Sequence, residues 1–186
     1  ATAAIVLWGG LEGDILRKIQ LAGFHVVTIM TTTGFATTDF DQWTAAAKSI
    51  LLLLMIIGAC AGSTGGAIKV VRILLVLKSG YRELRHVLHP KAVIPLRLGS
   101  ISVKDEMLRP SNIFVAMYII IFAQASLLLA IISYHDPRMT IETIFSAVAA
   151  TLGNVGPGLG MVGPTLSFAE IHPAGKMLLF LCMWIG

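Results

Sequence analysis

Two short glycine-containing runs have the residue types that can hold a cation without its water. The first is MTTTGFATTDF, residues 30–40, and the second is TLGNVGPGLG, residues 151–160. Backbone carbonyl oxygens can replace the hydration shell of a cation, and glycine permits the unusual dihedral angles that aim them into a pore. We expect the β-branched Thr31, Thr32 and Thr33 to form an extended strand before Gly34. Taken alone, both runs could be ordinary extracellular turns.

The two runs belong to a predicted repeat. Each follows a moderately apolar stretch, LRKIQLAGFHVVTIM or TIETIFSAVAA, and such stretches suit re-entrant helices that do not cross a bilayer. Gly34 and Gly156 are 122 residues apart, and the same offset pairs Met55 with Met177 and Cys60 with Cys182. The predicted unit is a span, a short re-entrant helix, a glycine turn and a second span. The negative end of each re-entrant helix would face a cation.

Two long apolar regions supply the spans. Ile113–Ser133 has 21 uncharged residues, enough for one crossing, with Ser111 or Asn112 as its N-cap. Thr44–Lys78 is too long for one crossing, and its middle, Gly58–Gly66, reads GACAGSTGG. Glycine-rich runs break helices, and irregular backbone at membrane depth needs cover from protein or a water-filled cavity. We therefore predict two helices joined by a polar loop inside the membrane.

The composition places the chain in the membrane class. It has 186 residues, of which 56% are hydrophobic and 13% charged, and its mean hydropathy is +0.83. A soluble domain averages about 25% charged residues, so soluble enzymes, disordered proteins and nucleic-acid modules are disfavoured. Cys60 and Cys182 both lie in apolar runs and are predicted to be buried thiols.

The basic residues predict an orientation. Nine of the 14 lysines and arginines lie in one stretch with only three acids: Lys69, Arg72, Lys78, Arg82, Arg85, Lys91, Arg97, Lys104 and Arg109. The positive-inside rule places this stretch in the cytoplasm, so the net charge of +4 is an orientation signal and not a nucleic-acid signal. Both chain ends interrupt the predicted repeats, and we expect the chain to be a piece of a longer membrane protein.

Four motifs resemble one family of transporters. MTTTGFATTDFD, GACAGSTGGAIKVVRILLVLK, RHVLHPKAV and TLGNVGPGLG are similar to the TrkH branch of the Trk/Ktr/HKT potassium transporters. The resemblance implies an all-α membrane protein with four span–pore loop–span repeats, of which this chain would hold the last two. Residues 1–80 would be the third repeat, with a broken second helix, 81–110 a basic cytoplasmic connector, and 111–186 the fourth repeat.

The resemblance also implies residue roles, and it implies no enzyme activity and no covalently bound cofactor. The ion-binding filter for K⁺ would consist of Thr32, Thr33, Gly34, Asn154, Val155 and Gly156. The intramembrane gate would consist of Gly62, Ser63, Thr64, Gly65 and Gly66. A cytoplasmic nucleotide-binding regulatory subunit of the TrkA type would face Arg82, Arg85, His89 and Lys91. Family members are homodimers, and the protein would be a multi-pass protein of the bacterial inner membrane.

Several weaker patterns have alternative interpretations. The loop Gly58–Gly66 could be a packing surface between helices. Asp39 and Asp41 could concentrate cations at the outer mouth or cap the helix of the run that starts at Thr44. His86 and His89 fit a helical metal pair, but two ligands alone make a weak site. The run GLGMVG, residues 158–163, fits a dinucleotide fingerprint but lacks its strand-to-helix context. Arg138 and Glu142 are predicted to form a surface pair of little energetic value.

Two other functions remain open at this stage. One is a Na⁺-permeable or NH₄⁺-permeable relative, because only two filters are visible. The other is a membrane-embedded enzyme or assembly subunit without a pore. Such an enzyme needs acids, histidines or an activated nucleophile within its spans. Between Thr44 and Lys69 the ionisable residues are Lys48, Cys60 and Lys69 itself, which argues against it.

Overall fold

The protein consists of helices joined by structured turns. The computed structural model describes residues 1–186 except 12, 90–96, 99–100 and 103–104. The helices are α1 (Thr2–Trp8), α2 (Ile15–Met30), α3 (Ala45–Ile57), α4 (Val70–Leu88), α5 (Asp105–Ile132), α6 (Ile141–Leu152) and α7 (Pro173–Ile185), with 3₁₀ turns η1 (Phe40–Gln42), η2 (Gly160–Val162) and η3 (Phe168–Glu170). Two-residue strands β1 (Arg97–Leu98) and β2 (Ile101–Ser102) pair antiparallel, with Arg97 opposite Ser102. The predicted all-α class is confirmed apart from this small ribbon.

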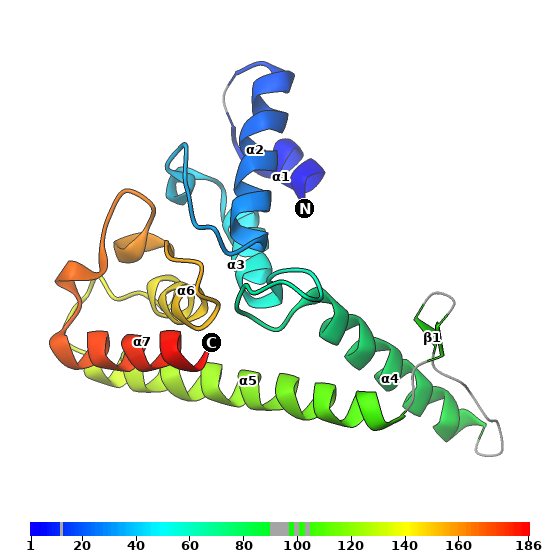
Figure 1. Ribbon diagram of the computed structural model, residues 1–186. Helices are drawn as coiled ribbons and strands as arrows, with labels where there is room; N and C mark the ends of the chain where they lie inside the picture. Colours follow the sequence, from blue (N-terminus) through cyan, green and yellow to red (C-terminus); the bar gives the residue numbers. More distant parts are fainter. Residues whose placement is uncertain (12, 90–96, 99–100, 103–104) are drawn as a thin grey trace.

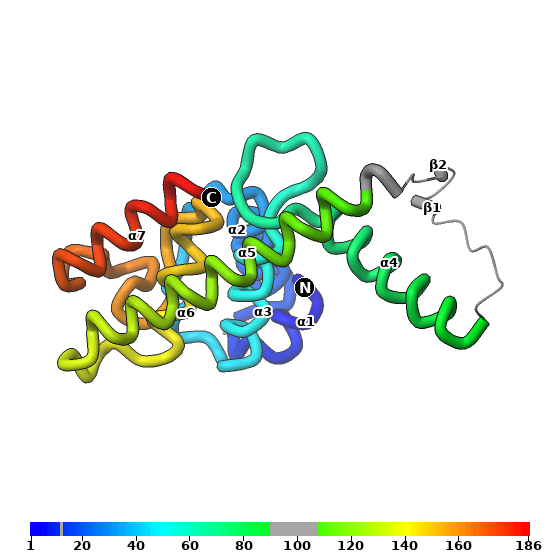
Figure 2. Tube along the Cα trace, turned by 90° about the horizontal axis from the view of Figure 1, so that it is seen from below, coloured from blue at the N-terminus to red at the C-terminus, as the bar shows by residue number. Residues whose placement is uncertain are grey.

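The helices form two groups that meet at α6. Figure 1 shows α1, α2 and α3 clustered together, while α7 lies along the far half of α5. Helix α4 leads away from α3 and packs beside the first part of α5, as the view in Figure 2 also shows. This α4–α5 contact includes the guanidinium of Arg72, 3.9 Å from the ring centre of Phe114, and a hydrogen bond from Asn112 to Ser79.

Helix α5 is the one helix of the described residues with the length and apolarity to cross a membrane. That segment is Leu108–Ile132, with 25 residues and a mean hydropathy of 2.5. The predicted span is confirmed, but the N-cap at Ser111 or Asn112 is wrong, because α5 begins at Asp105 and continues through Pro110. A proline near the start of a helix removes a single internal hydrogen bond. Leu108 is buried against Leu75 of α4, which supports the earlier start.

The predicted break in the second apolar region is confirmed. Helix α3 ends at Ile57, where Gly58 adopts a φ of +68°, and α4 begins at Val70. The intervening residues 58–69 contain no helix, and we call them the intramembrane loop after their predicted position. The predicted connector boundary at residue 81 is different in the structure, because α4 runs without interruption to Leu88.

Helix α6 is the structural centre. Every residue from Thr143 to Leu152 is buried except Phe145. Ala149 and Ala150 belong to a core with Ile29, Phe40 and Met55, while the α6 residues of the other core pack with α5 and α7. Thr140 begins the helix, because its side chain accepts a hydrogen bond from the N–H of Thr143.

The repeat is present, but its offset is not constant. Helices α2 and α6 end 122 residues apart, whereas α3 and α7, both 13 residues long, are 128 apart at either end. Met55 therefore corresponds to Met183, and the predicted pairing of Met55 with Met177 is wrong. The longer connection lies between Gly156 and α7.

The two cysteines differ in their burial. Cys60 follows α3 and is exposed, whereas Cys182 is buried within α7. The expectation that both thiols are buried is thus wrong for Cys60.

Ser146 connects α6 to this longer connection. Its buried hydroxyl accepts a hydrogen bond from the N–H of Leu159 at 2.9 Å and lies 3.3 Å from the carbonyl oxygen of the same residue. We predict that Ser146→Ala lowers the stability of the full-length protein by about 1–3 kcal/mol, because a buried N–H loses its partner. Thermal unfolding in detergent measures this. Ser49→Ala, on the exposed face of α3, is the matched control, and an equal effect of both variants would contradict the prediction.

Candidate functional site

Two turns come directly after the re-entrant candidates α2 and α6, and we call them the first turn (residues 31–34) and the second turn (residues 153–156). Both reverse direction through a left-handed residue, Thr32 with φ +57° and Asn154 with φ +53°. Gly34 and Gly156 come next, with φ of +77° and +112°. The extended strand expected before Gly34 is therefore wrong at Thr32. Asn tolerates this conformation, whereas a β-branched Thr does so rarely.

Hydrogen bonds explain this backbone path. The N–H of Thr32 donates to Ile29 and that of Thr33 to Thr28, at 3.1 and 2.8 Å. This is the Schellman arrangement that terminates a helix. The second turn repeats it 122 residues later, with Asn154 donating to Thr151 at 3.1 Å and Val155 to Ala150 at 2.8 Å. The glycine N–H groups also point back, with Gly34 donating to Thr28 at 3.2 Å and Gly156 to Ala150 at 3.4 Å.

These hydrogen bonds determine where four carbonyl groups point. In a trans peptide the C=O lies opposite the N–H of the next residue, and the chain has no cis peptide bonds among its described residues. Because the N–H groups of residues 33, 34, 155 and 156 point back to the helices, the preceding carbonyls point away from them. Within the described part of the chain these carbonyls accept no hydrogen bond. They belong to Thr32, Thr33, Asn154 and Val155.

The two turns contact each other closely. A Cβ atom placed on Gly34 would lie 2.0 Å from the carbonyl oxygen of Val155, so a side chain at this position cannot fit without moving the second turn. A Cβ on Gly156 would meet none of the described residues within 4 Å. A cavity of about 760 Å³ opens beside the turns. It is lined by all six predicted filter residues, Thr32, Thr33, Gly34, Asn154, Val155 and Gly156, together with part of α7.

The intramembrane loop reaches both turns through two of its glycines. A Cβ on Gly65 would lie 2.7 Å from the hydroxyl oxygen of Thr32, and one on Gly66 would lie 2.5 Å from the carbonyl oxygen of Gly153. Gly62, another predicted gate residue, has no described atom within 4 Å of such a position. The loop is therefore in contact with both turns, and a side chain at either point of contact would displace a neighbouring group.

The loop is held by its own ends. The N–H groups of Ile68 and Lys69 donate to the last carbonyls of α3, at 3.3 and 2.8 Å, and the Lys69 ammonium donates to the carbonyl of Ser63 at 2.5 Å. Gly65 in turn donates to the hydroxyl of Ser63 at 3.1 Å. Lys69 adopts a left-handed φ of +74°, which is strained for a residue with a side chain. This bracing makes the loop a defined structure attached to α3.

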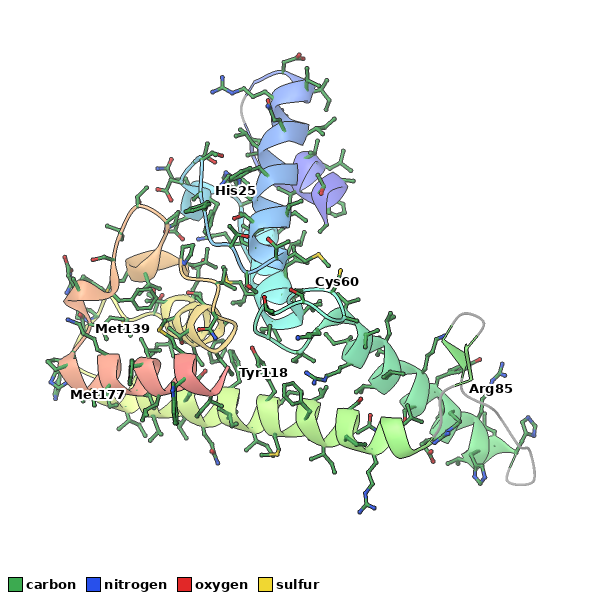
Figure 3. All side chains as sticks on the ribbon, in the orientation of Figure 1. His25, Cys60, Arg85, Tyr118, Met139 and Met177 are labelled. Carbon is green, nitrogen blue, oxygen red and sulfur yellow. The ribbon has the colours of Figure 1, made fainter. Side chains whose placement is uncertain are left out.

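The predicted partner-facing residues lie far from the turns. Arg82, Arg85 and His89 are at the end of α4; Arg85 and His89 are exposed and Arg82 is half-buried. Figure 3 shows Arg85 near the end of α4 that is remote from Cys60 and the intramembrane loop. Lys91 lies outside the described residues. His86 and His89 have no third ligand, because no cluster of three or more His, Cys, Asp or Glu side chains occurs in the described part of the chain.

The predicted pair of Arg138 with Glu142 is wrong. Arg138 bonds instead to Asp136, at 3.1 Å, and to Glu170, and the hydrogen bonds from Arg138 lower the pKa of the Asp136 carboxyl. Glu142 lies 2.7 Å from the ammonium of Lys48. Sequence reasoning missed this contact, and the isolated Lys48 at the start of an apolar run was the available signal.

The two aspartates after the first turn have structural partners. Asp39 accepts a hydrogen bond from the N–H of Asp41 and so begins η1. The N-cap of α3 is Thr44, so the expected capping of that helix by an aspartate is wrong. Asp41 accepts a hydrogen bond from the N–H of Gly160 at 2.9 Å. The GLGMVG run contains η2 and Gly160, and it is a connecting loop, not a strand-to-helix turn.

The fold and the paired turns define a helical protein of the membrane class that is built from two related repeats. The family model for TrkH, described as "Cation transport protein", matches residues 15–186. The chain therefore belongs to the TrkH family. It is 37% identical over 183 residues to the Trk system potassium uptake protein TrkH of Escherichia coli strain K12 and 34% identical to that of Halomonas elongata, covering 98% of this chain and 36% of each relative.

A solved structure agrees with this membership. The crystal structure of the potassium transporter TrkH from Vibrio parahaemolyticus matches the whole chain with a TM-score of 0.84 and 35% identity, covering 38% of that protein. This chain thus spans somewhat more than a third of the length of the relatives it matches.

The contact of Gly66 with the second turn can be tested. We predict that Gly66→Ala increases hydrogen exchange of residues 58–69 and 153–156 in the full-length protein by about tenfold, because the added methyl group must displace one of them. Hydrogen-exchange mass spectrometry measures this. Gly80→Ala on α4, where a Cβ meets no described atom within 4 Å, is the control and should leave both segments unchanged. Unchanged exchange in Gly66→Ala would contradict the contact.

Proposed function

We propose that the full-length protein conducts K⁺ across the bacterial cytoplasmic membrane, and that this chain supplies two of four parts of its filter. The observation that carries the proposal is the pair of turns whose carbonyls at Thr32, Thr33, Asn154 and Val155 point away from their helices. Such carbonyls can replace the water ligands of a K⁺ ion without any covalent chemistry. The names of the relatives as potassium uptake proteins support K⁺ as the transported ion.

The electrostatics of the turns suit a cation. Helices α2 and α6 both end at a turn, and the C-terminal end of a helix carries a partial negative charge. The N–H groups that would repel a cation are used within the Schellman turns. Permeation is then passive and needs no acid, base or nucleophile, in agreement with relatives named as transporters and not as enzymes.

The intramembrane loop is the proposed gate. It touches both turns through Gly65 and Gly66, and Ser63 and Thr64 belong to the same segment. Among the described residues no backbone hydrogen bond joins the loop to either turn, whereas the N–H groups at its end are hydrogen-bonded to α3. It can therefore move away from the turns while it remains attached to the helix. Its packing against the second turn is part of the same role, because those contacts hold the closed position.

The end of α4 is the proposed docking site for a TrkA-type nucleotide-binding subunit in the cytoplasm. Arg82, Arg85 and His89 place positive and polar side chains in the last turns of the helix, and the predicted contribution of Lys91 is part of the same proposal. The full-length protein is proposed to be a homodimer, as the family resemblance implies.

The filter assignment is tested by serine substitution. We predict that Gly34→Ser lowers the K⁺ over Na⁺ permeability ratio of the full-length protein by about tenfold, equivalent to about 1.4 kcal/mol of discrimination. Its Cβ would collide with the carbonyl of Val155 and displace a proposed ligand. Gly156→Ser should lower the ratio less, because its Cβ meets no described residue, although its φ disfavours serine.

Reversal potentials of proteoliposomes in mixed K⁺ and Na⁺ measure both variants against the unmodified protein. Unchanged ratios in both would refute the filter assignment. A ratio near one in the unmodified protein would favour the Na⁺-permeable relative, and higher permeability to NH₄⁺ than to K⁺ would favour the ammonium-permeable one.

The gate assignment makes a separate prediction. Deletion of residues 61–66 removes both contacts with the turns and leaves the hydrogen bonds of Lys69 and Ile68 to α3. We expect K⁺ flux into proteoliposomes to rise several-fold, with the permeability ratio preserved because the filter turns remain. The flux of Gly80→Ala should equal that of the unmodified protein. Unaltered flux in the deletion would show that the loop is not the barrier.

A further inference from the structure

A polar cluster connects the two repeats beside the proposed filter. The ammonium of Lys48, near the start of α3, lies 2.7 Å from a carboxylate oxygen of Glu142 and 3.6 Å from one of Asp41. The same oxygen of Asp41 accepts the hydrogen bond from the N–H of Gly160. We call Lys48, Glu142, Asp41 and Gly160 the inter-repeat bridge.

Each member of the bridge lies on a segment close to one of the turns along the chain. Glu142 is in the first turn of α6, whose last residue precedes the second turn, and Gly160 lies four residues after the second turn. Asp41 is in η1, beyond the first turn, and Lys48 is on the helix that comes next. The bridge thus joins the helix that leads into the second turn to the segments that follow both turns.

The bridge differs from an ordinary surface ion pair. The Lys48 side chain is only 19% exposed and that of Asp41 is 29% exposed, while Glu142, at the outer edge of the bridge, is 43% exposed. Asp41 combines an ion pair with a hydrogen bond to the backbone, and charge-assisted bonds of this kind are the stronger ones. Gly160 lies directly against α6, because a Cβ at this position would lie 2.3 Å from the hydroxyl oxygen of Thr143. Exposed pairs contribute little, whereas this one connects rigid elements.

A rigid connection at this place has a consequence for the carbonyls. Gly34 already contacts the carbonyl of Val155, so the distance between the turns depends on how α6 sits against α3 and η1. A shift of α6 by a fraction of an ångström changes the spacing of the carbonyl groups that would face the ion. Discrimination between K⁺ and Na⁺ depends on the size of the site and on the number and strength of its carbonyl ligands.

We propose that Lys48 is a positioning residue for ion selectivity, acting through Glu142 and Asp41 to set the spacing of the two turns. The inference rests on the proposed K⁺ permeation. Among the described residues no ion pair joins Lys48 to either turn, and in this proposal its ammonium does not bind the ion. Its role is to hold α6 and η1 to α3.

The experiment uses the full-length protein in proteoliposomes. Lys48→Met removes the charge and keeps most of the apolar stem, Glu142→Gln removes the acceptor charge, and the double variant removes both. We expect each single variant to lower the K⁺ over Na⁺ permeability ratio about three- to tenfold. We expect the double variant to be no worse than the single ones, because residues that act through one contact are not additive. Lys48→Arg, which keeps the charge, should have the permeability ratio of the unmodified protein.

The matched control is Arg138→Met. It also removes a cation from ion pairs, with Asp136 and Glu170, but these pairs lie within the fourth repeat. Its permeability ratio should equal that of the unmodified protein. Size-exclusion profiles and thermal unfolding establish that each variant is folded.

The outcomes separate this inference from the proposed function. Folded single variants with an unchanged ratio would overturn the positioning role and leave K⁺ permeation intact. Additive losses in the double variant would also overturn it, because Lys48 and Glu142 would then act separately. An unmodified protein without K⁺ selectivity would overturn the proposed function and this inference together.

Discussion

The close approach of Gly34 to the carbonyl oxygen of Val155 is the constraint on which the rest of the structure depends. Two backbone segments 121 residues apart in the chain touch at a point where no side chain fits. To bring them there, two helices must end side by side and both must turn back in the same way. The Schellman turns achieve this, because they satisfy the last helical carbonyls and at the same time point four other carbonyls away from the helices.

Helix α6 carries most of this arrangement. Its small buried residues, among them Ala147, Ala149 and Ala150, are fully inaccessible and allow helices from both repeats to pack closely around it. It contributes to both hydrophobic cores, begins at the inter-repeat bridge and ends at the second turn. A helix of 12 residues cannot itself cross a bilayer, so its position depends on its neighbours and not on lipid.

The repeats are similar in their turns and different in the connections from those turns to the next helix. The offset is 122 residues where α2 and α6 end and 128 at the next helix, so extra residues lie after the second turn. That connection contains η2 and η3, and the N–H of Gly160 in η2 donates to Asp41. The longer connection therefore has a structural use, because Gly160 within it provides one side of the contact between the repeats.

Sequence alone determined the membrane class, the break near Gly58, the span in α5, and the two glycine turns, because each depends on local properties: apolar length, helix-breaking residues and repeated motifs. The six predicted filter residues lie at one cavity as well, since their motifs and their offset identified them. The pairing of Lys48 with Glu142, the exposure of Cys60, the left-handed Thr32 and the changed offset of α7 were decided by tertiary structure. They depend on contacts between residues far apart in the chain. At Thr32 they also depend on the hydrogen bonds that end the helix, which outweigh the preference of a β-branched residue for negative φ. A charge pairs with the partner that packing brings within reach, and spacing along a helix did not identify it.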